Sequence, residues 1–295
     1  MTRRAAAWLI VAACSSTTAS TPGPTSPGRA LAPLSLAADD AMVTIPAGRY
    51  IAGSTPEERA AAYDDYRASA GQDTARERGW FDHEEERHVA TLPAFRIDLM
   101  PVTQTQYAEF VAAGKAPPPA IDEAAWKAQG FAQDFATQVL RFSWRDGHPP
   151  VGREEHPVVL VTWREAAAYC AWRGELRDHP RRLPSASEFE KAARGDSGLA
   201  YPWGNVYEAD KLDSAVTGPR DTLPTSSSGA SPYGVLDMAG NVFQWTATEL
   251  PEGQAIVKGS AWEDFAGMGR GASGHGRAKS ARHVIIGFRC AADPR

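Results

Sequence analysis

The chain has 295 residues, of which 43% are apolar and 23% charged, and its formal net charge is -5. A chain of this length and composition can bury one substantial core or two small ones, which excludes a disordered protein. Acidic and basic residues are interspersed without a basic stripe, so nucleic acid is not an expected partner. The 26 glycines and 22 prolines predict many turns and short strands and exclude an all-helical bundle.

The first residues predict a signal peptide of a bacterial lipoprotein. Two arginines at positions 3 and 4 precede an apolar stretch from Ala5 to Ala13, which is much shorter than the ~20 residues that cross a bilayer. The run Val11–Cys14 resembles the lipobox, where lipoproteins are cleaved and then acylated on the new N-terminal cysteine. We therefore predict a signal peptide over residues 1–13 and lipidation at Cys14. The alternative is an ordinary secretory signal with a chance cysteine.

Residues 14–40 are expected to form a lipidated, flexible linker. They are rich in Ser, Thr, Pro, Ala and Gly, a composition that buries too little apolar surface to offset the entropy of ordering. The folded domain is then expected to cover residues 41–295. Ser15 after the lipid site is compatible with outer-membrane sorting, so the sequence predicts an extracytoplasmic lipoprotein anchored in a membrane, on its periplasmic or surface face if the source is Gram-negative.

Short strands and short capped helices are predicted along the domain. Residues 42–50 alternate apolar and polar positions around a Pro/Gly turn, which predicts two strands, and residues 95–98 predict another. Capping boxes, in which Ser or Thr precedes Glu or Gln by three residues, predict three helices. They begin after Thr103, Thr162 and Ser185.

Two other features of the chain concern metal and redox chemistry. The histidines in Asp82–His88 are five residues apart and not four, so this segment is expected to be charged and solvated and not a zinc-protease motif. Cysteine occurs only at positions 14, 170 and 290. If Cys14 is acylated, Cys170 and Cys290 in an oxidising compartment are most simply one disulfide, worth roughly 4 to 5 kcal/mol as an upper figure. The alternative is two buried free thiols.

Seven motifs in order give the domain a family resemblance. Together they resemble the formylglycine-generating enzyme, or sulfatase-modifying factor, family over residues 42–293. The motifs are Ile45–Gly48, His156–Trp172, Arg182–Gly195, Tyr201–Asn205, Tyr233–Trp245, Gly259–Trp262 and Gly287–Asp293. The resemblance implies an irregular α+β fold related to C-type lectins, with little regular secondary structure. It also implies pairing of Cys170 with Cys290.

The chain departs from the family where the oxidase chemistry is expected. Oxidase members hold Cu(I) with two cysteines in the segment before the closing motif, and soft Cu(I) requires such thiolates. No cysteine lies between Cys170 and Cys290 here, so formylglycine-generating copper chemistry is not expected. The catalytic residues of the chain therefore stay unknown. The candidate pocket comprises Trp262, Glu263, Arg270, His275 and Arg277.

Several ligands remain open for this pocket. Met268 and His275 are possible ligands of copper. His275 with Glu263 or Asp264 is a possible site for another metal. The alternative to both is a solvated glycine-rich loop that binds no metal. Three arginines could instead form a pocket that binds a planar anion. These are Arg270, Arg277 and Arg282. The alternative is that they form separate salt bridges on the surface.

Calcium is a possible structural cofactor by the same resemblance. Family members bind Ca²⁺ partly through the loop that contains Asn241, but Gln244 stands here where the family has glutamate, which removes one hard anionic ligand. Asp213 is a further candidate ligand. The three residues are therefore weak calcium candidates.

Two functions follow from this resemblance. The first is a lipid-anchored binding or assembly module of the cell envelope, whose partners are the membrane and an envelope protein or peptide. The alternative is an oxidoreductase with altered chemistry, similar to the periplasmic pyoverdine-maturation branch, which works without the copper cysteines. The fold does not choose between them, so whether the protein is an enzyme stays open.

Overall fold

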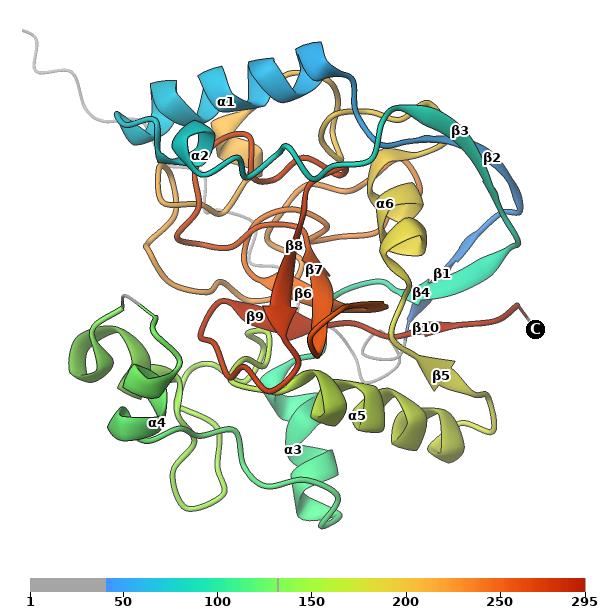
Figure 1. The fold of residues 1–295 in the computed structure, drawn as a ribbon. Helices are drawn as coiled ribbons and strands as arrows, with labels where there is room; N and C mark the ends of the chain where they lie inside the picture. Colours follow the sequence, from blue (N-terminus) through green and yellow to red (C-terminus); the bar gives the residue numbers. More distant parts are fainter. Residues whose placement is uncertain (1–40, 132, 295) are drawn as a thin grey trace, which may run out of the picture. The chain divides into compact units, whose positions relative to one another are not determined.

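Residues 41–131 and 133–294 are described by a computed structural model (Figure 1). The predicted signal peptide, Cys14 and the linker lie outside these residues. The observed architecture is α+β with short strands and mostly short helices, which confirms the predicted fold class. Among the described residues, no helix is both long enough and apolar enough to cross a membrane.

The first sheet joins the two ends of the domain. Its strand order is β1 (Met42–Ile45), β4 (Phe95–Asp98), β10 (Ala291–Ala292) and β5 (Arg181–Arg182), and all pairs are antiparallel. Ile97 of β4 is paired with Val43 on one side and Ala291 on the other. The buried face of this sheet forms a small core with helix α6 (Ala186–Arg194).

The second four-stranded sheet is built from the C-terminal part of the chain. Its order is β8 (Gly274–Ala278), β7 (Gln254–Lys258), β6 (Phe243–Leu250) and β9 (Ile286–Phe288). Strands β6, β7 and β8 are antiparallel neighbours, whereas β9 runs parallel to β6. Strand β8 is therefore an edge of this sheet. A separate ribbon pairs β2 (Gly48–Ala52) with β3 (His88–Leu92).

The predicted capping boxes are confirmed. They begin α3 (Gln104–Ala112), α5 (Trp163–Leu176) and α6, and in each box the side chain and the backbone bond reciprocally. A fourth box, Thr55 with Glu58, begins α1 (Pro56–Ala70), which was not predicted and is followed by α2 (Thr74–Glu77). In Figure 1, α1 and α2 lie at one end of the β6–β8 strands and α3 and α5 at the other. Helix α4 (Glu123–Ala128) and short turns over residues 135–142 and 209–211 complete the list.

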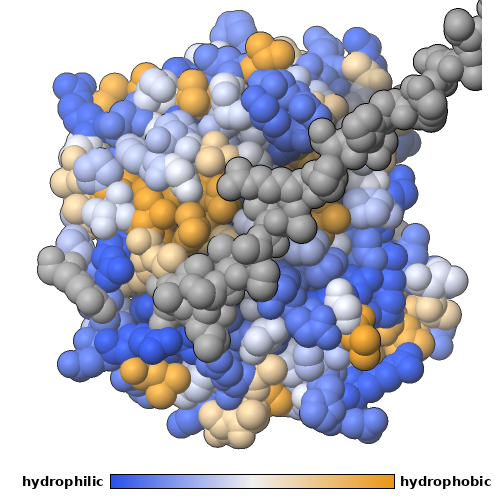
Figure 2. All heavy atoms as spheres, turned by 180° about the vertical axis from the view of Figure 1, so that it is seen from behind, coloured by the Kyte–Doolittle hydropathy of each residue, from blue (hydrophilic) through white to orange (hydrophobic). Residues whose placement is uncertain are grey.

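The predicted disulfide is present between Cys170 of α5 and Cys290, which lies between β9 and β10. Both cysteines are fully buried in the main core, so the alternative of free thiols is wrong. The same core contains Tyr107 stacked on Tyr169, and both rings pack edge-on against Phe288. On the face seen in Figure 2, hydrophilic residues dominate and hydrophobic residues gather mainly in one patch left of centre.

Candidate functional site

A hollow of about 520 Å³ lies beside the edge strand β8. Its size falls within the range of ligand-binding sites. One wall is the segment 78–83 after α2, and the other is formed by β8 with residues of β6 and β7. We call it the Arg277 hollow. It is lined by Arg78, Gly79, Trp80, His83, Leu250, Gln254, Ile256, Gly274, His275, Gly276 and Arg277.

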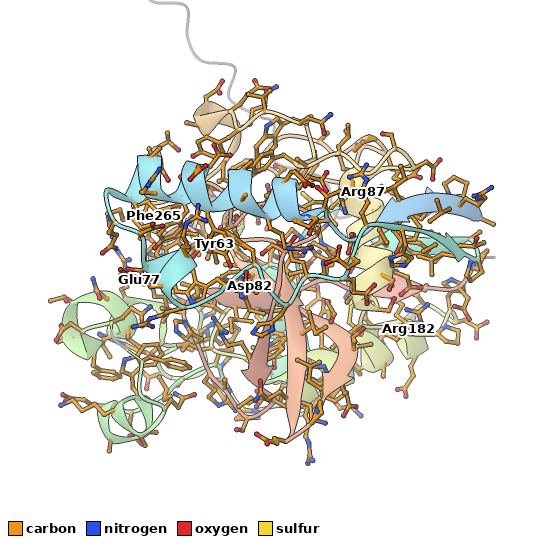
Figure 3. The ribbon with its side chains drawn as sticks, turned by 45° about the horizontal axis from the view of Figure 1, so that its top comes forward. Tyr63, Glu77, Asp82, Arg87, Arg182 and Phe265 are labelled. Atoms are coloured by element: carbon orange, nitrogen blue, oxygen red, sulfur yellow. A yellow bond between two sulfur atoms is a disulfide. The ribbon has the colours of Figure 1, made fainter. Side chains whose placement is uncertain are left out.

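Helix α1 fixes the wall formed by segment 78–83. The Tyr63 hydroxyl donates to Asp82 Oδ1 at 2.8 Å and accepts from the Phe81 amide at 2.9 Å, and Figure 3 shows Tyr63 and Asp82 together beneath α1. One turn further along α1, Tyr66 packs edge-on against Trp80, with ring centroids 5.6 Å apart. Two tyrosines of α1 therefore fix this wall: Tyr63 bonds to Asp82, and Tyr66 packs against Trp80.

The structure brings only part of the predicted pocket into the hollow. His275 and Arg277 line it. Trp262 instead lies in the core, with its ring stacked 6.0 Å from Phe142. Arg270 is buried and forms a bidentate ion pair with Glu84, at 2.9 and 3.0 Å.

The three arginines of the predicted anion site do not lie together in the structure. Arg282 is paired with Glu165 at 2.5 Å and donates to the Leu160 carbonyl at 2.7 Å. Arg270 is paired with Glu84. Of the three, only Arg277 lines the hollow and has no carboxylate within ion-pair distance among the described residues.

Two carboxyl groups act on Arg277 from the loop after Trp262. Burial lowers the pKa of Arg277, and the charges of Asp264 and Glu263 oppose that shift. Burial raises the pKa of Asp264 to about 7, and burial also raises the pKa of Glu263, which accepts from Gln133 Nε2 at 2.7 Å. Glu263, predicted from the sequence as a pocket residue, therefore acts on Arg277 through its charge and does not line the hollow.

His275 is neutral at physiological pH. Burial lowers its pKa to about 3, and the charges of Arg277 and Lys258 act in the same direction. Its ring lies edge-on to Phe243 at 5.6 Å, and its Nε2 is buried without a hydrogen-bond partner among the described residues. A buried polar atom without a partner is uncommon in native proteins.

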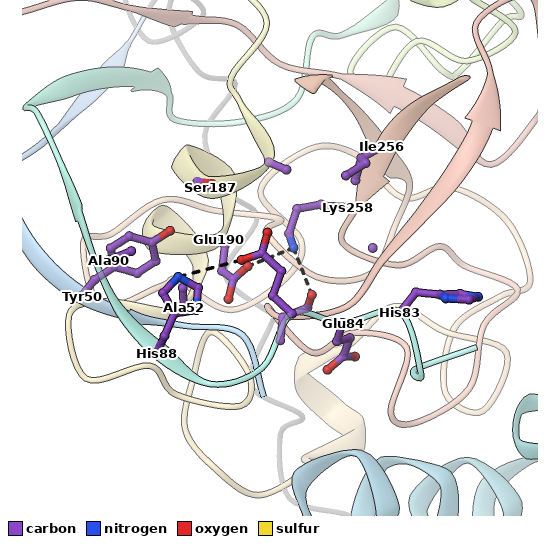
Figure 4. Close-up of a pocket in the computed structure, with 14 residues that line it drawn as sticks. Tyr50, Ala52, His83, Glu84, His88, Ala90, Ser187, Glu190, Ile256 and Lys258 are labelled. Carbon is purple, nitrogen blue, oxygen red and sulfur yellow. Dashed lines mark hydrogen bonds and ion pairs between the residues drawn. The ribbon is translucent and has the colours of Figure 1, made fainter. Parts of the chain in front are cut away.

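A smaller cavity of about 120 Å³ continues the hollow toward α6 (Figure 4). The two share His83, Ile256 and Gly274. In this Lys258 cavity, Lys258 Nζ donates to Glu190 Oε2 at 3.3 Å and to the Ala272 carbonyl at 3.1 Å. A lysine ammonium has three donors, so one remains for a ligand.

The residues near the hollow do not fit the family's copper. Cys170 and Cys290 are joined to each other, and Met268 is buried in the main core. Among the residues that the structure describes, no group of three or more His, Cys, Asp or Glu side chains has a metal-binding arrangement. The two-thiolate site therefore cannot form, and no step through copper is derived.

The three calcium candidates have different surroundings. The Asn241 side chain exchanges hydrogen bonds with the backbone of Leu223, at 3.0 and 3.2 Å. Gln244 accepts from Arg289 Nε at 2.5 Å and donates to the Asp237 carbonyl at 2.8 Å. Both amides are therefore engaged with protein groups.

Asp213 is the candidate whose carboxylate has no hydrogen-bond partner in the part of the chain that the structure describes. Both of its carboxylate oxygens are buried without a hydrogen-bond partner among the described residues. Burial raises its pKa to about 7, and the charges of Asp237 and Asp221 add to the shift. The carboxylate is therefore costly when ionised, unless a cation binds there.

We expect Asp213→Asn to stabilise the protein by about 1–3 kcal/mol at pH 8, because the neutral amide is less costly to bury than a carboxylate without a partner. The folded pKa is raised above the unfolded value of 3.8. The parent therefore has its full stability below pH 4, where Asp213 is protonated, and loses stability as the pH rises through 7. The advantage of the variant over the parent should accordingly vanish in acid. Urea unfolding at pH 4 and pH 8 measures this effect. Millimolar Ca²⁺ should stabilise the parent and not the variant if Asp213 is a ligand, and a parent more stable than the variant at pH 8 without Ca²⁺ would contradict the account.

Some site residues were missed in the sequence. Arg78 and Trp80 line the hollow, but their neighbours in the sequence carry no pattern that points to a site. Lys258 lines the smaller cavity and lies directly before the Gly259–Trp262 motif. The signal that was available is the capping box at Thr55 and Glu58, which marks the start of α1.

The comparisons with known proteins agree with the motifs. Residues 30–294 match the model of the sulfatase-modifying factor enzyme 1-like domain. The chain is 32% identical to the inactive C-alpha-formylglycine-generating enzyme 2 of Mus musculus, with 86% of each chain covered. It is also 32% identical to the formylglycine-generating enzyme of Mycobacterium tuberculosis, over 58% of this chain and 69% of that protein.

A solved structure has the same fold. PvdO from Pseudomonas aeruginosa matches with a TM-score of 0.64 at 22% identity, over 86% of this chain and 94% of that chain. The likeness concerns the fold alone. With the family model matched over nearly the whole chain, this protein belongs to the sulfatase-modifying factor family.

Proposed function

We propose that this protein is a lipid-anchored, extracytoplasmic binding module of the cell envelope without copper-dependent oxidase activity. The observation that carries the proposal is the state of its cysteines: the two in the domain are buried in one disulfide, so no thiolate is left for Cu(I). The anchor rests on the lipobox-like run that ends at Cys14. The mouse relative, whose name describes it as inactive, supports loss of the oxidase chemistry within this family.

The ligand that best fits the Arg277 hollow is an anionic segment of an envelope protein or peptide. Arg78 and Arg277 line the hollow without a carboxylate partner among the described residues. Guanidinium groups recognise carboxylates through paired hydrogen bonds, and Trp80 adds an aromatic surface. Positive charge next to an aromatic wall favours binding of an acidic ligand.

One observation favours the alternative function, an oxidoreductase with a non-cysteine site. Asp264, whose pKa is raised to about 7 by burial, and neutral His275 both lie near Arg277. Clusters of perturbed groups beside a hollow are typical of catalytic sites, although structural networks produce them as well. An oxidoreductase of this kind would contain a bound metal and turn over a substrate, whereas a binding module would do neither.

The test is metal analysis of the full-length chain in mild detergent, combined with oxygen-uptake assays on a cysteine-containing sulfatase peptide. We expect neither stoichiometric copper or iron nor oxygen uptake that depends on the peptide. Stoichiometric metal together with peptide-dependent uptake would overturn the binding-module proposal and favour the oxidoreductase.

Arg277→Ala is expected to weaken binding of an acidic peptide about 10- to 100-fold, because a hydrogen bond to a charged group contributes about 1.5–3 kcal/mol. The probe is an acetylated hexapeptide of alternating glutamate and valine, and the Kd is measured by fluorescence anisotropy. Arg164→Ala, which removes an exposed arginine on α5, is the matched control and should leave the Kd unchanged. Equal losses in both variants would show that only net charge matters.

A further inference from the structure

We propose that the Arg277 hollow takes an extended acidic peptide, which adds as a fifth strand to the open edge of β8. This inference rests on the proposed binding function and specifies how the ligand is held. In strand addition, the affinity comes from backbone hydrogen bonds and the specificity from pockets for alternate side chains.

The hydrogen bonds around β8 show which of its backbone groups face the open edge. Lys279 N donates to the Gly253 carbonyl at 2.9 Å, in the register that pairs His275 with Val257 and Arg277 with Ala255. In an antiparallel pair, only alternate residues exchange hydrogen bonds with the neighbouring strand. The odd-numbered residues of β8 therefore bond to β7, and the backbone groups of Gly274 and Gly276 point away from it.

An independent contact supports this alternation. Arg277 Nη1 donates to the Gly276 carbonyl at 2.9 Å, so that carbonyl is turned away from β7. Among the described residues, no other strand pairs with β8 on this side. Outward N–H and C=O groups are what an incoming strand requires, and the Gly276 carbonyl has a second lone pair beside the one that accepts from Arg277.

The hollow reaches this edge of β8. Four successive residues, Gly274–Arg277, line it, although side chains of a strand alternate between its two faces. The hollow also contacts Leu250 of β6 and Gln254 and Ile256 of β7, so it covers the glycine face of this sheet and reaches the edge of β8. Segment 78–83 forms its far wall, so a peptide would lie between that segment and β8.

Charge decides which peptide fits. Arg78 and Arg277 have no carboxylate within ion-pair distance among the described residues, and no acidic side chain lines the hollow. At the Gly274 end, the hollow meets the Lys258 cavity, whose lining includes Lys258 and the carboxylates of Glu84, Glu85 and Glu190. The cations without a carboxylate partner among the described residues therefore lie in the hollow itself, where acidic side chains of an extended peptide would complement Arg78 and Arg277.

The experiment uses the full-length chain labelled with ¹⁵N-glycine, in detergent, with the glutamate–valine hexapeptide as the probe. We expect saturable binding, with slower hydrogen exchange of the Gly274 and Gly276 amides in the complex. N-methylation of the probe at the three alternate amides that face β8 should weaken binding at least tenfold. Methylation of the other three amides is the matched control and should change it less than twofold.

Three outcomes would overturn the proposal. Binding without protection of Gly274 and Gly276, or equal effects of both methylation patterns, would mean that the hollow binds the acid without strand addition. Equal binding of a lysine–valine hexapeptide would remove the charge argument. Self-association that protects the same glycines without peptide would identify a second copy of the chain as the occupant. The proposed function fails separately, on metal content and oxygen uptake.

Discussion

Replacing Glu190 with glutamine is expected to lower the free energy of unfolding by about 3–5 kcal/mol, because it leaves two buried cations without a counter-charge. Arg194 Nη1 lies 2.6 Å from Glu190 Oε1, and Lys258 Nζ lies 3.3 Å from Oε2. Both cations are at most 4% exposed. The same carboxylate also accepts from the Gly53 amide at 2.8 Å, which ties α6 to the turn after β2.

The pH dependence of this effect has a defined sign. Burial by itself would raise the pKa of Glu190, but Lys258 and Arg194 outweigh it, so the pKa is lowered from 4.5. The stabilisation is therefore present at neutral pH and is lost as the pH falls below 4.5 through the folded pKa. Urea unfolding of the parent and variant at pH 7 and pH 3 should show the difference shrinking in acid.

A matched control separates burial from loss of charge. Glu123→Gln removes an exposed carboxylate that pairs with Lys127 on α4 and should change the stability by less than about 0.5 kcal/mol. A loss of stability in Glu190→Gln no larger than in this control would contradict the account of the buried network.

Removing the disulfide by Cys170→Ala with Cys290→Ala should cost about 2–5 kcal/mol of stability. The bond closes a loop with a sequence separation of 120, so much of the unfolded chain loses freedom while it is intact. The two positions are fully buried in the main core, and the loss of sulfur also leaves small cavities there.

Urea unfolding measures this loss in the double variant and in the parent with and without reductant. We expect reductant to lower the midpoint of the parent and to leave that of the double variant unchanged. Cys14→Ser keeps the pair intact and serves as the control. A parent whose midpoint is insensitive to reductant after full unfolding and refolding would contradict a stabilising role for the bond.

Local sequence patterns predicted much of the fold because their physical causes are local. A Ser or Thr three residues before Glu or Gln satisfies the free amides at a helix start, which is why the boxes at Thr103, Thr162 and Ser185 are present. The same reasoning applied to Thr55 would have found α1. The disulfide followed from the number of cysteines, the predicted compartment and the ordered motifs.

The candidate site was predicted only in part because charge pairing depends on distant residues. Arg270 and Arg277 are seven positions apart and equally plausible in the sequence. Their roles differ because Glu84, which is 186 positions from Arg270, reaches one of them and not the other.

The sequence by itself determined the family, three of the capped helices, the disulfide pair and the absence of copper thiolates, since these depend on residue identity and short spacing. The tertiary structure alone decided which charges are neutralised and where a ligand has room. Wall segment 78–83 is placed against β8 by contacts of α1, and the edge of β8 stays open because no described strand pairs with it. Such features arise from contacts between segments far apart in the chain, which no local pattern encodes.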